Sequence, residues 1–473
     1  MKRLLTALFL GVVTASPGTV TAVDSETTPR PVPLTRPEMK QYLEDMKARK
    51  PRIPLPELTE EDKANLGERA SSYESRLRYH YMPSRDGEQR TGGRSSSGGF
   101  GRENDPEMSL TYAFKTELFW IVSRTNNCQY CLGHQESKLL GAGLTEDQIA
   151  ALDCDWSVFS PEEQTAFAFA RKITYEPHLV NDADIDQLRK HYTDRQILEM
   201  ILSVAGNNSI NRWKEGAGIP QSANGGGFGR RTPTGAEVAE TADRLRVPET
   251  YLTPTAQQYK SVVTIVAPLL LDEKTGAPTR MTVSRRPALE SRQEVEAALA
   301  AARQRTPRLP LVDEGQAKEV LPEDFPAGTL PQWVRLLATF PTSAPGRISS
   351  IRSAEQRGDL TPLLKAQASW IIARQDRAWY AAGEAKRRLQ QLGWTDDQIY
   401  QLDGSWDEFT PTERALFTIA RKLAATPIVL TDAEVDEAVK LAGPRDVVQL
   451  ISYTTNRASF DRITEAAGLR IEE

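Results

Sequence analysis

Apolar residues recur at helical rather than strand spacing along most of this chain. Leu118, Ile121 and Val122 share one face of a helix that we expect to end near Thr125. The apolar positions that predict the next helix are Cys131, Leu132, Leu139 and Leu140. Because strand-like alternation is nearly absent, the pattern predicts an all-α fold built from bundles of short helices.

Helix starts are marked by capping boxes, in which a capping residue is followed three positions later by Glu or Gln. Two such boxes predict helix starts, Thr145 with Gln148 and Ser160 with Glu163, the second with Pro161 at the first helical position. Asn181 or Asp182 is expected to cap another helix, and Thr193 or Asp194 to open a further one. This last start opens the last long helix of the repeat, over residues 196–205.

The chain matches itself without gaps at one fixed offset. Residues 144–149 recur as 394–399, an offset of 250 residues (394 minus 144). The same offset pairs Trp120 with Trp370, Trp156 with Trp406, Phe159 with Phe409, and Pro161 with Pro411. A weaker match at a slightly different offset sets residues 51–55 against 307–311. Two repeats of this size indicate a domain duplication rather than a solenoid.

The length of 473 residues agrees with two domains, because it exceeds what one compact core usually holds. We expect the first domain over residues 35–220 and the second over 291–473, joined by a linker and insert over 221–290. A stretch rich in Gly, Ser and Arg, at about 84–103, is expected to interrupt the first domain. Within the insert, the β-branched run 261–266 leaves open a hairpin or a single helix.

The start of the chain is typical of a secretory signal peptide over residues 1–22. Lys2 and Arg3 precede an apolar stretch, residues 4–13, and small residues follow at Val20, Thr21 and Ala22. No later stretch reaches the roughly 20 apolar residues that span a bilayer. We therefore expect an exported protein, periplasmic or secreted, with no membrane span.

Composition narrows the class of partner. The chain is 39% hydrophobic and 26% charged, as in ordinary globular proteins. Its net charge is only -5, and basic and acidic residues are interspersed, so no basic stripe predicts nucleic-acid binding.

Candidate chemistry gathers in residues 126–134. Asn127 is expected to cap a helix, so that Cys128 and Cys131 lie in its first turn, three residues apart on one face. Exposed amide hydrogens and the positive end of the helix dipole stabilise a thiolate at that position. His134 follows one turn later, where its imidazole can exchange a proton with Cys131. The segment therefore predicts a redox-active dithiol with a neighbouring base.

Other interpretations of these residues stay open. The cysteine pair can be half of a zinc site, although the second pair of ligands is absent from the sequence. It can also be a static disulfide, since exported compartments oxidise neighbouring thiols. Cys154 is expected to be a buried structural thiol, and Glu117 and Glu136 would ordinarily be solvated helix residues. We predict no metal and no cofactor.

Residues 117–144, with shorter stretches such as 195–197 and 211–212, resemble the carboxymuconolactone decarboxylase-like, or alkylhydroperoxidase-like (AhpD-like), family. The resemblance covers about residues 116–220 and extends to the second repeat. It implies two tandem AhpD-like helical-bundle domains that pair within the chain, with further association into a homo-oligomer left open. It also implies that Cys131 attacks a hydroperoxide, that Cys128 resolves the sulfenic acid as a disulfide, and that Glu117 and His134 relay protons.

The chain departs from the family pattern at both relay positions. The family histidine commonly lies four residues after the second cysteine, where this chain has Gln135, and the family glutamate lies twelve residues before the first cysteine, where it has Thr116. In the second repeat the four candidate residues are replaced altogether: Cys128 becomes Ala378, Cys131 becomes Ala381, His134 becomes Glu384, and Glu117 becomes Gln367. We expect the second domain to be degenerate and to pack against the first, in place of a symmetric subunit contact.

The favoured interpretation is an exported enzyme: a thiol-dependent peroxidase or dithiol/disulfide oxidoreductase with peroxiredoxin-like activity. Its substrate would be a hydroperoxide or a disulfide, and a thiol reductant would reset the pair. The alternative is a non-catalytic exported scaffold or binding module with a structural disulfide. A decarboxylase-type lyase is less favoured, because lactone decarboxylation needs no dithiol.

Overall fold

The computed structural model describes residues 27–83, 105–221, 248–279 and 288–472. The predicted signal peptide, residues 1–22, and the Gly-rich stretch at about 84–103 lie outside these ranges. The described residues confirm the all-α prediction, since extended pairing among them is limited to two isolated bridges, Thr35 with Val263 and Leu271 with Pro278. None of the described helices is both long and apolar enough to cross a membrane.

The first half of the chain forms a run of short helices that ends in a long one. Its α-helices are α1 (Arg36–Asp45), α2 (Glu60–Leu66), α3 (Tyr73–Tyr81), α4 (Tyr112–Asn126), α5 (Gln129–Gly141), α6 (Glu146–Cys154), α7 (Pro161–Tyr175), α8 (Asp182–Leu188) and α9 (Asp194–Gly216). The capping boxes at Thr145, Ser160, Asn181 and Thr193 open α6, α7, α8 and α9 as predicted.

The second half repeats this order. Its α-helices are α11 (Arg292–Ala302), α12 (Glu314–Glu319), α13 (Gln332–Leu337), α14 (Ala344–Gln356), α15 (Pro362–Asp376), α16 (Trp379–Gln391), α17 (Asp396–Gln401), α18 (Pro411–Ala424) and α19 (Asp432–Ala466). α15, α16, α17 and α18 begin 250 residues after α4, α5, α6 and α7. α19 joins the counterparts of α8 and α9 across a kink at Gly443, whose φ of 83° lies in the region that favours glycine.

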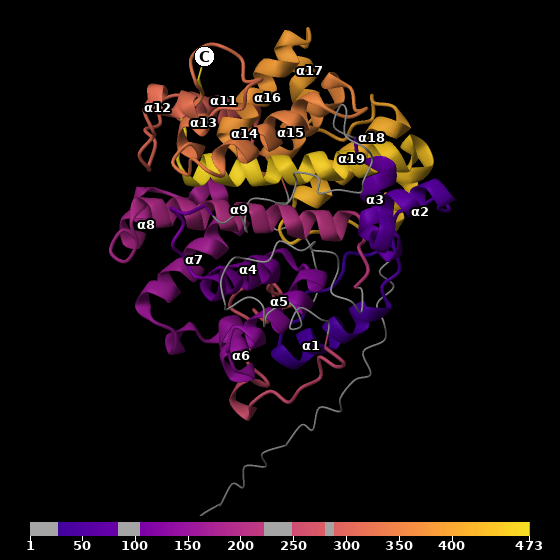
Figure 1. Cartoon of the computed structure of the whole chain (residues 1–473), viewed down its shortest axis with the longest axis vertical. Helices are drawn as coiled ribbons and strands as arrows, with labels where there is room; N and C mark the ends of the chain where they lie inside the picture. Colours follow the sequence, from indigo (N-terminus) through magenta and orange to yellow (C-terminus); the bar gives the residue numbers. More distant parts are fainter. Residues whose placement is uncertain (1–26, 84–104, 222–247, 280–287, 473) are drawn as a thin grey trace, which may run out of the picture.

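The two long helices lie side by side across the middle of the molecule. Figure 1 shows α9 and α19 in contact, with α4 to α7 on one side of the pair and α13 to α18 on the other. The contact is close because Gly216 of α9 has no side chain. A Cβ there would lie 2.8 Å from Ile451 Cγ2 and 3.0 Å from a methyl group of Leu423.

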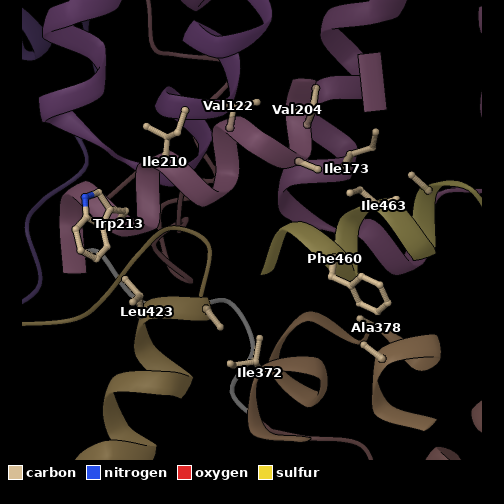
Figure 2. Close-up of a cluster of buried hydrophobic side chains, with 14 of the residues drawn as sticks. Val122, Ile173, Val204, Ile210, Trp213, Ile372, Ala378, Leu423, Phe460 and Ile463 are labelled. Carbon is tan, nitrogen blue, oxygen red and sulfur yellow. The ribbon is translucent and has the colours of Figure 1, made fainter. Parts of the chain in front are cut away.

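One hydrophobic cluster extends through both halves. Figure 2 shows Ile210 and Trp213 from α9 and Val122 from α4 in the same region as Leu423, Phe460 and Ile463 from the second half. All six side chains are at most 8% exposed. Burial of this apolar surface is the main contribution to the stability of the contact between the halves.

Polar contacts between the halves are reciprocal. Arg212 Nη2 donates to the carbonyl oxygen of Ala424 at 2.8 Å, and Arg462 Nη2 donates to that of Thr174 at 3.0 Å. Arg462 is the repeat counterpart of Arg212, and Ala424 that of Thr174. Each half therefore makes the same contact with the other half, as the subunits do in a two-fold symmetric dimer.

A second reciprocal pair involves the segments matched by the weaker repeat. Arg52 pairs with Asp432, and Arg308 Nε pairs with Asp182 Oδ1 at 3.0 Å. Each arginine also donates to a backbone carbonyl at the end of its own long helix, at Glu215 and Glu465 respectively. These segments therefore fasten each half to the other at equivalent places.

Three helix-level expectations need correction. α9 continues to Gly216, eleven residues past the predicted end, because residues 206–216 are mostly polar yet buried between the halves. Residues 261–266 form no helix, and Val263 makes only an isolated bridge, while residues 280–287 lie outside the described ranges. Leu140, expected on the apolar face, is 48% exposed.

Candidate functional site

The cysteine pair lies where α4 gives way to α5. Asn127 was predicted to cap α5, and this prediction is wrong. Asn127 instead ends α4 in the left-handed conformation, with φ 58°. The chain turns through this single residue, so the cap of α5 falls one position later, on Cys128. The Sγ of Cys128 accepts a hydrogen bond from the backbone N–H of Cys131 at 3.4 Å. The cysteines therefore stand at the cap and at the third residue of the helix, where backbone N–H groups have no acceptor within the helix.

Cys128 and Cys131 are joined as a disulfide, with their Cα atoms 5.3 Å apart. The two residues are 0% and 2% exposed. Within the described ranges, no three His, Cys, Asp or Glu residues are grouped so that they could hold a metal ion. The sulfur atoms of the oxidised pair are thus buried in the first half of the protein.

His134 is buried on the same helix, at 5% exposure. Its ring centroid lies 4.7 Å from that of Tyr130, one turn earlier. Between Cys131 and His134, a Cβ on Gly133 would lie 2.3 Å from Gln221 Nε2 and 2.6 Å from the Tyr251 hydroxyl oxygen. We call Gln221 and Tyr251 the cover, because they close over this turn of α5.

Glu117 is buried at 6% exposure, in contrast to the expected solvated state. Burial, together with the charge of Glu163 at the start of α7, raises the pKa of Glu117 to about 8. The structure places Cys131 and His134 on α5, with Cys128 at its cap, and Glu117 on the preceding helix α4.

The raised pKa of Glu117 predicts a loss of stability at high pH. The folded state keeps the proton up to about pH 8, whereas the unfolded chain releases it near pH 4.5. The contribution of Glu117 to stability is therefore fully present below pH 4.5 and is lost as pH rises to about 8. Glu117→Gln, which installs the residue of the second repeat, should raise the free energy of unfolding at pH 9 by roughly 2–4 kcal/mol and change it little at pH 4.

Urea denaturation of both proteins at the two pH values measures this difference. The exposed Glu57→Gln variant is the control and should unfold like the parent at both. An equal effect of Glu117→Gln at pH 4 and pH 9 would mean that the carboxyl group does not titrate in this range.

Glu136 also differs from its expected solvated state, since it is 4% exposed. Its carboxylate accepts from Arg36 of α1, with Nη2 to Oε2 at 2.8 Å, and the same guanidinium reaches Glu146 at 3.1 Å. Arg36 is 100 residues from Glu136 in sequence, so spacing alone could not pair them. These charges hold α1 against α5 and α6.

Cys154 ends α6, and its Sγ lies 3.3 Å from the carbonyl oxygen of Ala150. It is partly rather than fully buried, in contrast to the prediction. Burial, with the charges of Asp153 and Asp155, raises the pKa of its thiol to about 11. At pH 8 only about one molecule in a thousand carries this thiolate, against roughly a quarter for free cysteine.

We therefore expect iodoacetamide to alkylate Cys154 on the order of 100-fold more slowly than a free thiol at pH 8. Mass spectrometry over time, with a urea-unfolded sample as control, measures the rate. Alkylation at the rate of the unfolded sample would contradict the raised pKa.

Sequence reasoning missed two buried polar residues of α9. Ser203 and Asn207 are both 2% exposed, and Ser203 Oγ and Asn207 Nδ2 have no hydrogen-bond partner among the described residues. In the second repeat the counterpart of Asn207 is Arg457, whose Nη2 lies 3.6 Å from Glu384, the counterpart of His134. Asn207 and His134 are therefore the counterparts of two residues that form an ion pair in the second repeat. The sequence match at offset 250 could have singled out Asn207 in this way.

Fold and site together define an all-helical protein with one oxidised Cys-x-x-Cys pair at a helix start. No family model matches the chain. A stretch of 97 residues, 20% of the chain, is 33% identical to an uncharacterized protein, YdfG, of Bacillus subtilis (strain 168). The chain covers 63% of the length of that relative.

Proposed function

We propose that this chain is an exported thiol-dependent peroxidase or dithiol/disulfide oxidoreductase of the AhpD-like kind, acting through Cys128 and Cys131. The proposal includes a degenerate second domain, because that half has alanine at both cysteine positions. A hydroperoxide or a disulfide would be the substrate, and an external thiol would be the reductant.

The observation that carries this proposal is the backbone of the second repeat. Cys128 has φ -83° and ψ 88°, and Ala378, its counterpart, has φ -87° and ψ 89°. The left-handed residue before each is also retained, with φ 58° at Asn127 and 54° at Arg377. Since the turn adopts the same conformation without sulfur, the local fold does not require a disulfide.

The short loop that the disulfide closes supports the same conclusion. A cross-link between residues three apart removes little entropy from the unfolded chain, about 2 kcal/mol in the chain-entropy model. A long-range disulfide would stabilise the protein more. Reversible oxidation is thus a better reason than stability for a pair at this position.

The proposed reaction balances as a two-electron reduction of the peroxide. The Cys131 thiolate attacks one peroxide oxygen, an S–O bond forms, the O–O bond breaks, and the alcohol or water leaves after taking up a proton. The Cys128 thiolate then attacks the sulfenic sulfur, the S–S bond forms, the S–O bond breaks, and the departing hydroxide takes up a proton and leaves as water. An external dithiol returns two electrons to the pair and is itself oxidised to a disulfide. His134, one turn after Cys131 on α5, is the candidate to supply the protons.

Burial of the pair favours the second candidate, a scaffold with a structural disulfide. Both cysteines are at most 2% exposed, and the cover lies over the same helix. An inert structural disulfide is expected in such surroundings. For the peroxidase, the same burial restricts direct access to small hydroperoxides unless the cover moves.

Thiol titration of the full chain before and after one equivalent of hydrogen peroxide tests the proposal. If the pair is a redox centre, mild reductant yields two new thiols, and one peroxide consumes both. The Cys128→Ala/Cys131→Ala variant, which copies the second repeat, is the control and should fold but consume no peroxide. A disulfide that resists mild reductant, and thiols that persist in peroxide once formed, would reject the redox function in favour of the scaffold.

A further inference from the structure

A segment of the insert packs against the first half of the protein. Residues 251–266 contain one short 3₁₀ turn, Gln257–Tyr259, and otherwise run without helix. The backbone N–H of Tyr251 donates to Glu44 Oε2 at 2.9 Å, and that of Thr264 donates to the carbonyl oxygen of Leu34 at 2.9 Å. We call residues 251–266 the strap.

One end of the strap covers the turn of α5 that carries Cys131. Tyr251 is buried, and its hydroxyl oxygen would lie 2.6 Å from a Cβ on Gly133. This hydroxyl donates to Gln221 Oε1 at 3.4 Å. Gln221 Nε2 in turn donates to the carbonyl oxygen of Tyr130, the residue before Cys131, at 3.4 Å. The strap therefore supplies part of the cover and holds the rest in place.

The other end of the strap is bonded to Asp153, near the end of α6. Thr264 is buried, and its hydroxyl donates to Asp153 Oδ1. The backbone N–H of Ile265 donates to the carbonyl oxygen of the same aspartate at 2.9 Å. Asp153 Oδ1 also accepts from Arg124 Nε of α4 at 2.9 Å. The strap thus shares this carboxylate with α4.

The second half shows the equivalent aspartate with a different partner. The counterpart of Asp153 is Asp403. Within the described ranges, its carboxylate accepts hydrogen bonds from two side chains, Trp370 Nε1 at 2.8 Å and Arg374 Nε at 2.9 Å. Trp120, the counterpart of Trp370, is 0% exposed, and its Nε1 has no hydrogen-bond partner among the described residues. The first half therefore has the strap hydroxyl where the second half has the indole N–H.

Thr264 and Trp120 are alternative donors to Asp153. Trp120 and Arg124 lie one turn apart on α4, and Arg124 reaches Asp153, so this face of α4 adjoins the carboxylate. A buried indole N–H without an acceptor is unfavourable. Release of the strap removes this penalty, because Trp120 then donates to Asp153 as its counterpart does in the second half.

The strap leaves much of its apolar surface in solvent. Leu252, Val262 and Ile265 are exposed, whereas Tyr251 and Val266 are buried. Segments with few buried apolar contacts open locally at a lower free energy than the helical core. The strap can therefore leave the surface while the helices stay folded.

We propose that the strap is a releasable segment that controls how fast an external thiol reduces the disulfide. In the closed form, Thr264 donates to Asp153 and Tyr251 packs over α5. In the released form, Trp120 donates to Asp153, and Tyr251 leaves the turn next to the disulfide. The inference rests on the redox function proposed above, but its tests measure reduction of the disulfide and use no peroxide.

Reduction of the full chain by dithiothreitol, followed over time by alkylation and mass spectrometry, tests the proposal. Thr264→Val removes the hydroxyl donor and should be reduced at least about tenfold faster than the parent. Thr264→Ser keeps the hydroxyl and should be reduced at the parent rate. Thr275→Val is the matched control, because it removes a hydroxyl that donates to Asp272 in an exposed turn of the same insert, and it should change nothing. A parent rate in Thr264→Val, or equal acceleration in either of the other variants, would overturn the proposal.

Two further measurements detect the release itself. In NMR spectra of the indole N–H groups, Thr264→Val should shift the signal of Trp120 as its hydrogen bond to Asp153 forms, and Trp120→Phe identifies that signal. In the parent, the amides of Thr264 and Ile265 should exchange with solvent at least about tenfold faster than those in the middle of α9. An unchanged Trp120 signal, or strap amides as protected as those of α9, would reject the release. A Thr264→Val protein that is reduced quickly but then consumes no peroxide would reject the peroxidase and support the strap.

Discussion

Peroxide consumption should fall by at least about 1,000-fold when Cys131 is replaced by serine, because a hydroxyl at this position has no thiolate form near neutral pH. Cys128→Ser should behave differently. It keeps the attacking sulfur, so it should consume one equivalent of peroxide and then stop as a sulfenic acid, which dimedone traps. Peroxide loss with time, together with mass spectrometry of the trapped product, distinguishes the two variants.

Cys154→Ser is the matched control for this pair, because it removes the remaining cysteine of the chain without touching the disulfide. It should consume peroxide like the parent. If Cys128→Ser is inert and Cys131→Ser traps a sulfenic acid, the two roles are exchanged. If the parent protein is as slow as Cys131→Ser after full reduction, the disulfide has no peroxidase role.

The second large effect is expected at the contact between the halves. Arg462 pairs with Asp376 through Nη1 to Oδ2 at 2.8 Å and Nη2 to Oδ1 at 3.1 Å, and both side chains are at most 5% exposed. Arg462→Met would leave the Asp376 carboxylate buried without its partner. We expect a loss of about 3–5 kcal/mol in the free energy of unfolding, measured by urea denaturation.

The repeat supplies the control for this experiment. Arg212, the counterpart of Arg462, contacts the neutral Asn126 where Arg462 contacts Asp376. Arg212→Met should therefore cost less, about 1–3 kcal/mol. Adding Asp376→Asn to Arg462→Met should recover part of the loss, because the unpaired buried charge is gone. Equal losses in both arginine variants, with no recovery in the double variant, would show that packing and not charge dominates.

Much of the fold could be predicted from local signals. Capping boxes mark α6 to α9 because the capping side chain and the third helical residue satisfy each other within four residues. The offset of 250 residues likewise carries over to helix starts, since duplicated core positions require duplicated helices. Both signals can be recognised in the sequence without knowing which distant residues are in contact.

Helix ends and burial could not be predicted where they depend on contacts with segments distant in sequence. The polar end of α9 is helical because α19 buries it, and a reading of apolar periodicity stops before it. Glu136 is buried against Arg36 from α1, and the pKa of buried Glu117 is raised further by the charge of Glu163, 46 residues later in the chain. At the site, the position of the cysteines on a helix start was predictable, whereas the cap shifted from Asn127 to Cys128 through a backbone turn that composition does not reveal.

The reciprocal contact of α9 with α19 is made within one polypeptide, and this determines how it responds to dilution. A contact between separate subunits weakens as their concentration falls, whereas two halves on one chain meet at a fixed effective concentration. Covalent connection also lets each side change independently. Asn211 and Asp461 occupy equivalent positions in the two halves, a difference that identical subunits could not maintain. The two halves of the duplicated chain therefore contact each other as the subunits of a dimer do, but they can differ in sequence at equivalent positions.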